Sequence, residues 1–181
     1  MVSSYLTPRE LEQLAELADR LLVAPLLEGG RDAAVQVAVE QRTLEQLPAA
    51  HQAAQHCRTI PGVGPLGSTC LGYTLTRIPY TNSDAVIAHT GFDPRPADSG
   101  QKHGRRRLSK RGPGELRRVL FNCGMAAAKT PLWRPYYQAQ RAKGLSSTAA
   151  IIILSRKLVR VAFALHKHNQ PFDPARIVVQ A

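Results

Sequence analysis

Residues 147–168, Ser-Thr-Ala-Ala-Ile-Ile-Ile-Leu-Ser-Arg-Lys-Leu-Val-Arg-Val-Ala-Phe-Ala-Leu-His-Lys-His, decide the fold class of this chain. The three consecutive isoleucines favour a strand, but they lie inside a periodic stretch that is too long for one. Apolar residues recur along it at helical spacing: Ile151, Ile152, Leu154, Leu158, Val161, Phe163 and Leu165. The stretch predicts one long amphipathic helix. Because the chain carries no convincing hairpin-type alternation, we expect an all-α fold.

Cap and breaker residues predict shorter helices before this one. Thr81-Asn82-Ser83-Asp84 predicts the cap of a helix over 85–90, and Pro131 the end of a helix over 114–129. The apolar positions of the latter are Leu116, Val119, Leu120, Cys123 and Met125. Trp133, Tyr136 and Tyr137 begin a short helix that ends near Lys143-Gly144, and Pro171-Phe172-Asp173-Pro174 closes the fold. We interpret the three aromatic residues as core, with base stacking as the alternative.

The first 57 residues predict a helical arm. Thr7-Pro8-Arg9-Glu10 is a capping box with proline at the first helical position, and leucines then recur at helical spacing to about Leu27. A second helix is expected over 32–57, with a kink at Pro48. The arm is either a coiled-coil-like element for self-association or a plain packed hairpin. We expect three parts: the arm over 1–57, a compact helical domain over 58–175, and a tail over 176–181.

The segment Thr59-Ile60-Pro61-Gly62-Val63-Gly64-Pro65-Leu66-Gly67-Ser68 resembles the turn of a helix-hairpin-helix element, followed by a short helix over 68–75. Gly62 and Gly64 permit positive φ and allow backbone N–H groups to face a phosphate at the next helix N-terminus. A glycine turn that serves only close packing is the alternative.

Charge is concentrated in one part of the chain. Residues 1–60 carry five Lys/Arg against eight Asp/Glu, whereas residues 95–160 carry sixteen against two, within a net charge of +11 for the whole chain. A dense cationic run follows Ser99-Gly100 and comprises Lys102, Arg105, Arg106, Arg107, Lys110 and Arg111. Such asymmetry points to a polyanionic partner, and a serine beside it is positioned to attack a phosphodiester.

Other classes of protein are disfavoured. The chain has no run of eighteen apolar residues and no signal-peptide pattern at its start, so we expect neither a membrane span nor secretion, but a cytoplasmic protein. Cys57, Cys70 and Cys123 match no zinc spacing and are expected to be reduced thiols. His166 and His168 point apart on a helix, so no metal site is expected. Gly-x-Ser-x-Gly and Walker motifs are absent from the sequence.

In chain order, six short segments resemble the C-terminal domain of the insertion-sequence-110/116/902 family of transposases, to which pilin-gene invertases are related. The segments are Ile60-Pro61-Gly62-Val63-Gly64, Gly91-Phe92-Asp93-Pro94-Arg95, Ser99-Gly100, Leu108-Ser109-Lys110-Arg111-Gly112 with Leu116-Arg117, Tyr136-Tyr137 with Lys143-Gly144, and the last helix with Pro171-Phe172-Asp173-Pro174. Each is weak alone, but their order and spacing over about residues 58–175 make the resemblance specific.

The resemblance implies an unusual serine recombinase. In this family a RuvC-like domain supplies metal-binding carboxylates, a coiled coil dimerises, and the C-terminal domain supplies a serine that attacks DNA and forms a phosphoserine link. Ser99 matches the nucleophile, and Lys110-Arg111 with their neighbours match the positions that hold the DNA backbone. DNA is thus the implied partner, with a guide RNA as a further one in several members, in a bacterial cytoplasm and nucleoid. A divalent metal, Mg, is expected only with the RuvC-like domain, and no cofactor is expected on this chain.

Several assignments stay open. Asp98 and His103 are candidates to orient or deprotonate Ser99, and Ser109 is the competing serine, with a helix N-cap as its structural alternative. Arg156, Lys157 and Arg160 either extend the phosphate track or form the wet face of the last helix. No RuvC-like pattern of spaced carboxylates is recognised before residue 58. Two functions therefore remain: a transposase component that works with a RuvC-like domain, or a non-catalytic DNA- or RNA-binding remnant of a truncated transposase.

Overall fold

The computed structural model describes residues 48–95 and 107–176. The predicted arm up to residue 47 and the tail from residue 177 lie outside the described residues. The elements are α3 (Pro48–Arg58), α4 (Pro65–Arg77), α5 (Ser83–Thr90), β1 (Pro94–Arg95), β2 (Arg107–Leu108), α6 (Gly114–Ala127), α7 (Arg134–Ala142), α8 (Ser147–His168) and the 3₁₀ turn η2 (Pro174–Arg176). The described part is mostly helical, which confirms the predicted fold class.

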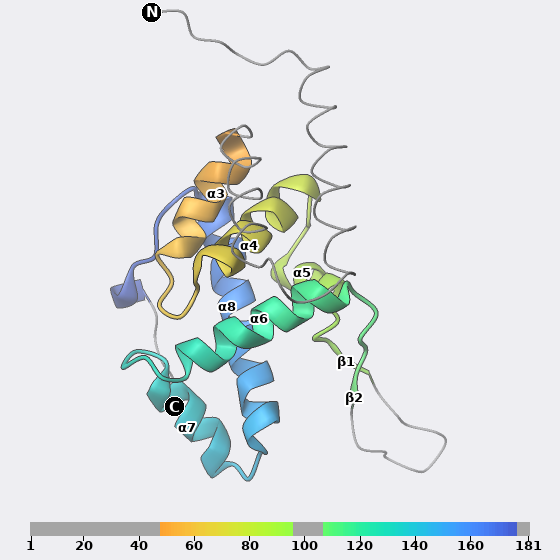
Figure 1. The fold of residues 1–181 in the computed structure, drawn as a ribbon, viewed down its shortest axis with the longest axis vertical. Helices are drawn as coiled ribbons and strands as arrows, with labels where there is room; N and C mark the ends of the chain where they lie inside the picture. The colour runs from red at the N-terminus through yellow and green to blue at the C-terminus, as the bar shows by residue number, and fades with distance from the viewer. Residues whose placement is uncertain (1–47, 96–106, 177–181) are drawn as a thin grey trace, which may run out of the picture.

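Helix α8 is the axis of the fold. It contacts α3, α4, α5, α6 and α7, and Figure 1 shows it running behind α6 from the α7 end of the molecule toward α3. Its predicted bounds are confirmed at both ends. Ser146 caps the start by accepting a hydrogen bond from the Ala149 N–H at 3.2 Å, and Asn169 ends the helix in the left-handed region at φ 49°.

The buried face of α8 differs in part from the predicted one. Leu154 and Leu158 are fully buried as expected, but the face is completed by Ala150, Ser155, Val159 and Ala162. Ala150, Leu154, Leu158 and Ala162 stand four residues apart and therefore form one line along the helix. The predicted Ile151, Ile152, Val161, Phe163 and Leu165 are only partly buried beside it. Small residues on the central line allow the surrounding helices to approach closely.

Helices α5 and α6 confirm two further predictions. Asn82 caps α5 by accepting the Ala85 N–H at 2.9 Å, and Gly91 ends it at φ 71°. In α6, Val119, Leu120 and Cys123 are buried as predicted, but Met125 is wrong as a core position because 38% of its surface is exposed. The core side of α6 continues through Gly124 and Ala127 instead, which keep the helical spacing that Met125 breaks.

Helices α3 and α4 form a hairpin and contact each other more extensively than any other pair. The helix expected over 32–57 is confirmed only from Pro48, where the described residues begin. Helix α4 begins at Pro65, three residues before the predicted start. Proline is well tolerated at the first helical position, where its missing N–H would have no partner in the helix, so a segment that resembled a loop is the first turn of α4.

Helix α7 ends as predicted, with Gly144 at φ 82° after its C-cap Lys143. Trp133, just before α7, is fully buried and is the largest core side chain, which excludes it from surface base stacking, whereas Tyr136 and Tyr137 are partly buried against the core. Phe172 closes the fold by packing against the Trp133 ring, with 6.2 Å between the ring centroids. Across the described residues no helix is long and apolar enough to cross a membrane.

Candidate nucleic-acid interface

A two-strand ladder stands at the base of the segment that contains Ser99. Strands β1 and β2 pair antiparallel, with Pro94 opposite Leu108 and Arg95 opposite Arg107. We call residues 91–95 and 107–112 the neck, because they join residues 96–106 to the helical domain (Figure 1). The sequence did not predict this pairing, since strands of two residues are too short to show alternation.

Asp93 and Ser109 hold the two sides of the neck together. The Ser109 N–H donates to the Asp93 carbonyl oxygen at 2.9 Å, and the Ser109 hydroxyl donates to the Asp93 carboxylate oxygen Oδ1. The Arg111 N–H contacts the same hydroxyl oxygen at 3.5 Å. Ser109 is thus not the N-cap of a helix. Its hydroxyl is engaged in joining the two strands, a structural role that sets it apart from a free nucleophile.

The end of the neck next to the helical domain is anchored on α5 and α6. The Lys110 N–H donates to the Gly91 carbonyl at 3.2 Å, and the Arg117 guanidinium donates to the carbonyls of Thr90 at 3.4 Å and Gly112 at 3.2 Å. A Cβ atom at Gly112 would lie 1.7 Å from the His89 carbonyl oxygen. Only a glycine at this position allows the neck to pass so close to the end of α5. Arg117, an arginine of the basic region, is therefore a structural anchor.

Cations are concentrated on the outside of the neck. Arg95, Arg107, Lys110 and Arg111 are exposed, and Asp93 is the single acidic residue of the neck. Arg95 and Arg107 are directly opposed across the ladder, and like charges so placed are destabilising. No ion pair involving these four side chains is found within the described residues. An anion placed between them would remove the repulsion, so the neck has the charge arrangement of a phosphate-binding surface.

The predicted site residues divide into two groups. Ser99, Lys102, Arg105 and Arg106 lie outside the described residues, as do Asp98 and His103. Arg107, Lys110 and Arg111 lie on the neck and are exposed there. Lys110 adopts φ 54°, in the left-handed region that non-glycine residues rarely occupy. That Arg107, Lys110 and Arg111 bind nucleic acid stays a prediction, and all three are exposed as such a role requires.

The two glycines of the α3–α4 turn differ in what surrounds them. Gly62 has φ 92°, and a Cβ there would lie 2.4 Å from the Ala127 Cα of α6. Burial raises the pKa of the Cys123 thiol, and the backbone of Gly64 opposes that shift. These contacts favour close packing over phosphate binding for Gly62. Gly64 has open space where a Cβ would lie, and its carbonyl accepts a hydrogen bond from the Ser68 N–H of α4 at 2.9 Å.

Alanine substitutions at Gly62 and Gly64 separate the two roles. We expect Gly62→Ala to lower the thermal midpoint strongly, because the new Cβ meets α6 backbone and the positive φ is unfavourable for alanine. A loss of about 2–4 kcal/mol in unfolding free energy is the expected scale for such overpacking with backbone strain. Gly64→Ala, at the N-cap of α4 with a φ of −80°, should cost no more than about 1 kcal/mol. Equal midpoints for the two variants would contradict the packing role.

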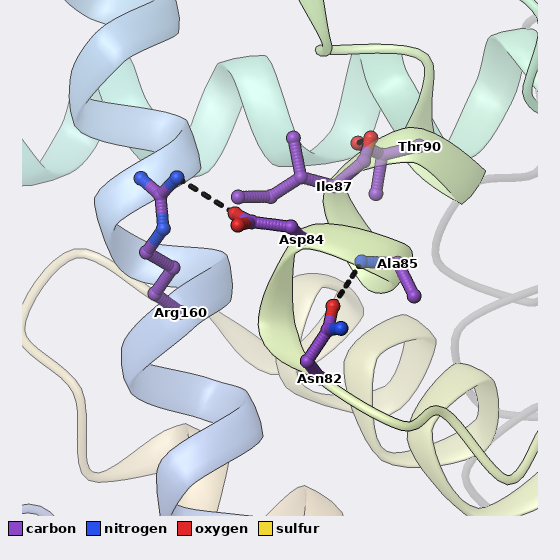
Figure 2. Close-up of polar contacts among 6 residues, drawn as sticks. All are labelled: Asn82, Asp84, Ala85, Ile87, Thr90 and Arg160. Atoms are coloured by element: carbon purple, nitrogen blue, oxygen red, sulfur yellow. Dashed lines mark hydrogen bonds and ion pairs between the residues drawn. The ribbon is translucent and has the colours of Figure 1, made fainter.

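Arg156, Lys157 and Arg160 of α8 differ in their surroundings. Arg160 extends to Asp84 of α5 at 2.9 Å, as Figure 2 shows beside the Asn82 cap. Burial lowers the pKa of the Arg156 guanidinium, Arg160 lowers it further, and Asp84, Tyr136 and Asp93 oppose the shift. Its Nε is buried without a hydrogen-bond partner among the described residues. Lys157 is partly buried.

Sequence reasoning missed Asp93 and Arg117 as residues that build the neck. Both stood in motif segments, Gly91-Phe92-Asp93-Pro94-Arg95 and Leu116-Arg117, but no local pattern links Asp93 to a serine sixteen positions away. The one sequence feature that could have indicated the role of Asp93 is that it is an isolated acidic residue in a cationic segment. An acid that is kept among many bases often has a specific partner.

Comparison with known proteins gives a family for this region. The model for the Transposase IS116/IS110/IS902 family matches residues 54–138, which include α4, α5, the neck and α6. The "Insertion element IS116 uncharacterized 44.8 kDa protein" of Streptomyces clavuligerus is 30% identical over 133 residues, covering 70% of this chain and 32% of the relative.

Two further relatives have functional names. The "Transposase for insertion sequence element IS1328" of Yersinia enterocolitica is 31% identical over 142 residues, covering 74% of this chain and 41% of the relative. The "Pilin gene-inverting protein" of Moraxella bovis is 26% identical over 133 residues, covering 70% of this chain and 40% of the relative. The chain thus matches only about a third to two fifths of the length of these relatives.

Proposed function

Because residues 54–138 belong to the IS116/IS110/IS902 transposase family, we propose that this chain is a DNA-binding component of an insertion-sequence recombinase that uses Ser99 as its nucleophile. DNA is the substrate that a transposase and a gene-inverting protein have in common. In this proposal the neck binds DNA phosphates, and residues 96–106 bring Ser99 to the scissile phosphodiester.

One observation carries the proposal: the neck opposes Arg95 to Arg107 at the point where the Ser99 segment joins the domain. Arginines paired across an antiparallel ladder extend their side chains from the same face, where like charges are unfavourable in the free protein. Each guanidinium group can form paired hydrogen bonds to phosphate oxygens, and a bound phosphodiester would neutralise both. Lys110 and Arg111 are adjacent. DNA binding would relieve the repulsion between Arg95 and Arg107, and this relief would contribute to the affinity for DNA.

The proposed chemistry is a transesterification. The Ser99 hydroxyl oxygen forms a bond to phosphorus, and the bond from phosphorus to a deoxyribose oxygen breaks. The serine proton passes to a base, for which Asp98 and His103 are the neighbouring candidates. The deoxyribose oxygen leaves and takes up one proton to become a hydroxyl, so no proton is gained or lost overall. Guanidinium groups balance the charge that develops on the phosphate oxygens. The phosphoserine ester retains a reactive phosphate, so attack by a new strand end reverses the step and joins DNA.

The metal of this reaction is assigned to a RuvC-like domain. Within residues 48–95 and 107–176, no three His, Cys, Asp or Glu side chains gather closely enough to hold a metal ion. We derive no step through a metal on these residues, and the proposal places divalent magnesium with the RuvC-like carboxylates. Self-association through residues 1–57 and use of a guide RNA are further parts of the proposal.

Charge removal at the neck tests DNA binding. We expect the triple variant Arg107→Gln, Lys110→Gln, Arg111→Gln to bind duplex DNA more weakly whatever its sequence, since phosphate contacts carry no base information. The slope of log affinity against log salt should flatten by about 0.9 for each phosphate that the variant no longer neutralises. Fluorescence anisotropy at several salt concentrations measures both quantities.

A matched control removes three exposed cations elsewhere. Lys129→Gln, Arg134→Gln, Lys143→Gln makes the same change in net charge around α7, away from the neck. We expect it to have a much smaller effect on affinity and slope. If both triple variants weaken binding equally, net charge rather than the neck determines affinity, and the proposed site is wrong.

A further inference from the structure

A pocket of about 570 Å³ lies between the second half of α8 and the chain that follows it. This volume is within the range of about 300–1,000 Å³ that is usual for small-molecule sites. Apolar side chains, chiefly Val161, Leu165 and Phe172, line it together with the cations Lys157, Arg160 and Arg176. The pocket shares no residue with the neck.

The geometry of the pocket follows from the way α8 ends. Its helical lining residues recur three or four positions apart, from Lys157 to His168, so they share one face of the helix. Asn169, in the left-handed region, then reverses the chain, and the Gln170 N–H donates to the Leu165 carbonyl at 3.1 Å. The residues after Gln170 therefore return along that face and form the opposite wall.

Phe172 is held in place as part of that wall. Its N–H donates to the Thr59 hydroxyl at 2.8 Å, and its ring contacts the buried Trp133 ring with 6.2 Å between centroids. The ring is only partly buried and also lines the pocket. A partly exposed aromatic ring that is fixed from behind can stack on a base. Because the ring is already ordered in the folded protein, binding does not have to immobilise it and loses little side-chain entropy.

The pocket carries three cations, two of which are already paired with carboxylates. Arg160 pairs with Asp84 at 2.9 Å, and Arg176 contacts Asp173 at 3.5 Å. Lys157 forms no ion pair with any described residue, and Asp173 is the pocket's single carboxylate. The ammonium group of Lys157 is thus uncompensated. Lys157 lies on the same face of α8 as Val161 and Leu165, which line the pocket together with Phe172.

We propose that this pocket binds one unpaired nucleotide of a single-stranded nucleic acid, with the base against Phe172 and its phosphate at Lys157. An aromatic platform accepts the face of any base, and Lys157 provides the cation that the backbone requires. A base in a duplex is already stacked on both faces, so the pocket selects unpaired strands. The inference rests on the proposed function in taking nucleic acid as the ligand, but it uses a surface separate from the neck.

Trp133, the single tryptophan of the chain, provides the readout, because it contacts Phe172 from behind. We expect single-stranded oligo(dT), titrated into the full chain, to change Trp133 emission with the same dissociation constant that anisotropy of a labelled oligo(dT) gives. Lys157→Gln should weaken this binding and flatten its salt slope by about 0.7, the value for one single-strand phosphate contact. Phe172→Leu, which keeps an apolar group against Trp133, should weaken it at least about fivefold.

Two controls separate this inference from the proposed function. Lys143→Gln removes an exposed lysine outside the pocket and should leave oligo(dT) binding unchanged. The neck triple variant should lose duplex affinity but keep the Trp133 response. Oligo(dT) affinity unaltered by both Lys157→Gln and Phe172→Leu would overturn the pocket assignment while leaving the neck intact. The assignment is also overturned if a peptide of residues 1–47 gives the Trp133 response and displaces oligo(dT), because the acidic arm is then the occupant.

Discussion

We expect Ser99→Ala to abolish the covalent protein–DNA adduct while leaving DNA affinity almost unchanged. The reaction forms a bond between the Ser99 oxygen and phosphorus, and alanine has no oxygen with which to form it. The cations of the neck remain, and phosphate contacts dominate affinity for DNA. The measurement is a denaturing gel of the full chain with a nicked DNA substrate, a divalent metal and an added RuvC-like domain. We expect the wild type to accumulate the adduct. The nick allows the released strand to leave, so its end cannot attack the phosphoserine and reverse the step.

Ser109→Ala is the matched control for this experiment. Its hydroxyl donates to Asp93, so its removal loosens the neck without removing the proposed nucleophile. We expect the adduct to form more slowly but to remain. An adduct on Ser99→Ala would assign the nucleophile to another residue. A wild-type chain that binds DNA with the expected salt dependence and yet forms no adduct would favour the binding-only alternative.

The helices were predictable where their signals were local. Asn82 before α5, Ser146 before α8 and Gly144 after α7 each act within four residues, so their effect is visible in a short window of sequence. The start of α4 at Pro65 was missed because proline and glycine are as common in loops as in a first helical turn. Met125 was misplaced for a related reason: apolar character alone does not show which side of a helix faces the core.

The candidate site was less predictable because its contacts are distant in sequence. Gly62 needs positive φ whether it binds phosphate or packs, and only the approach of Ala127 from α6 distinguishes the two roles. The same holds for the neck, where the contacts between Asp93 and Ser109 and between Arg117 and Thr90 join separate segments. The cationic region can be recognised in the sequence alone, since charge density is a local property. Composition did not separate cations that anchor backbone, such as Arg117, from exposed cations such as Arg107.

Asp93→Ala should slow adduct formation by about a hundredfold, the scale expected when a reacting group is displaced by about 1 Å. Asp93 lies just before β1 and contacts Ser109 through its carbonyl and carboxylate oxygens, so it sets how the two strands leave the domain. Alanine keeps the carbonyl and loses the carboxylate. Affinity for duplex DNA should change little, because removal of an acid from a cationic surface does not remove phosphate contacts. Single-turnover rates at saturating DNA separate the rate from the affinity.

Asp93→Asn and Asp84→Asn distinguish positioning from a general loss of stability. The asparagine carbonyl at position 93 can still accept the Ser109 hydroxyl, so Asp93→Asn should recover much of the wild-type rate. Asp84→Asn breaks the exposed pair with Arg160, which is worth no more than about 1 kcal/mol, and should leave the rate unchanged. A positioning role requires that the rate follow the hydrogen bond to Ser109 and not the thermal midpoint. If Asp93→Ala and Asp93→Asn were equally slow, the charge of Asp93 rather than its contact with Ser109 would be what the reaction needs.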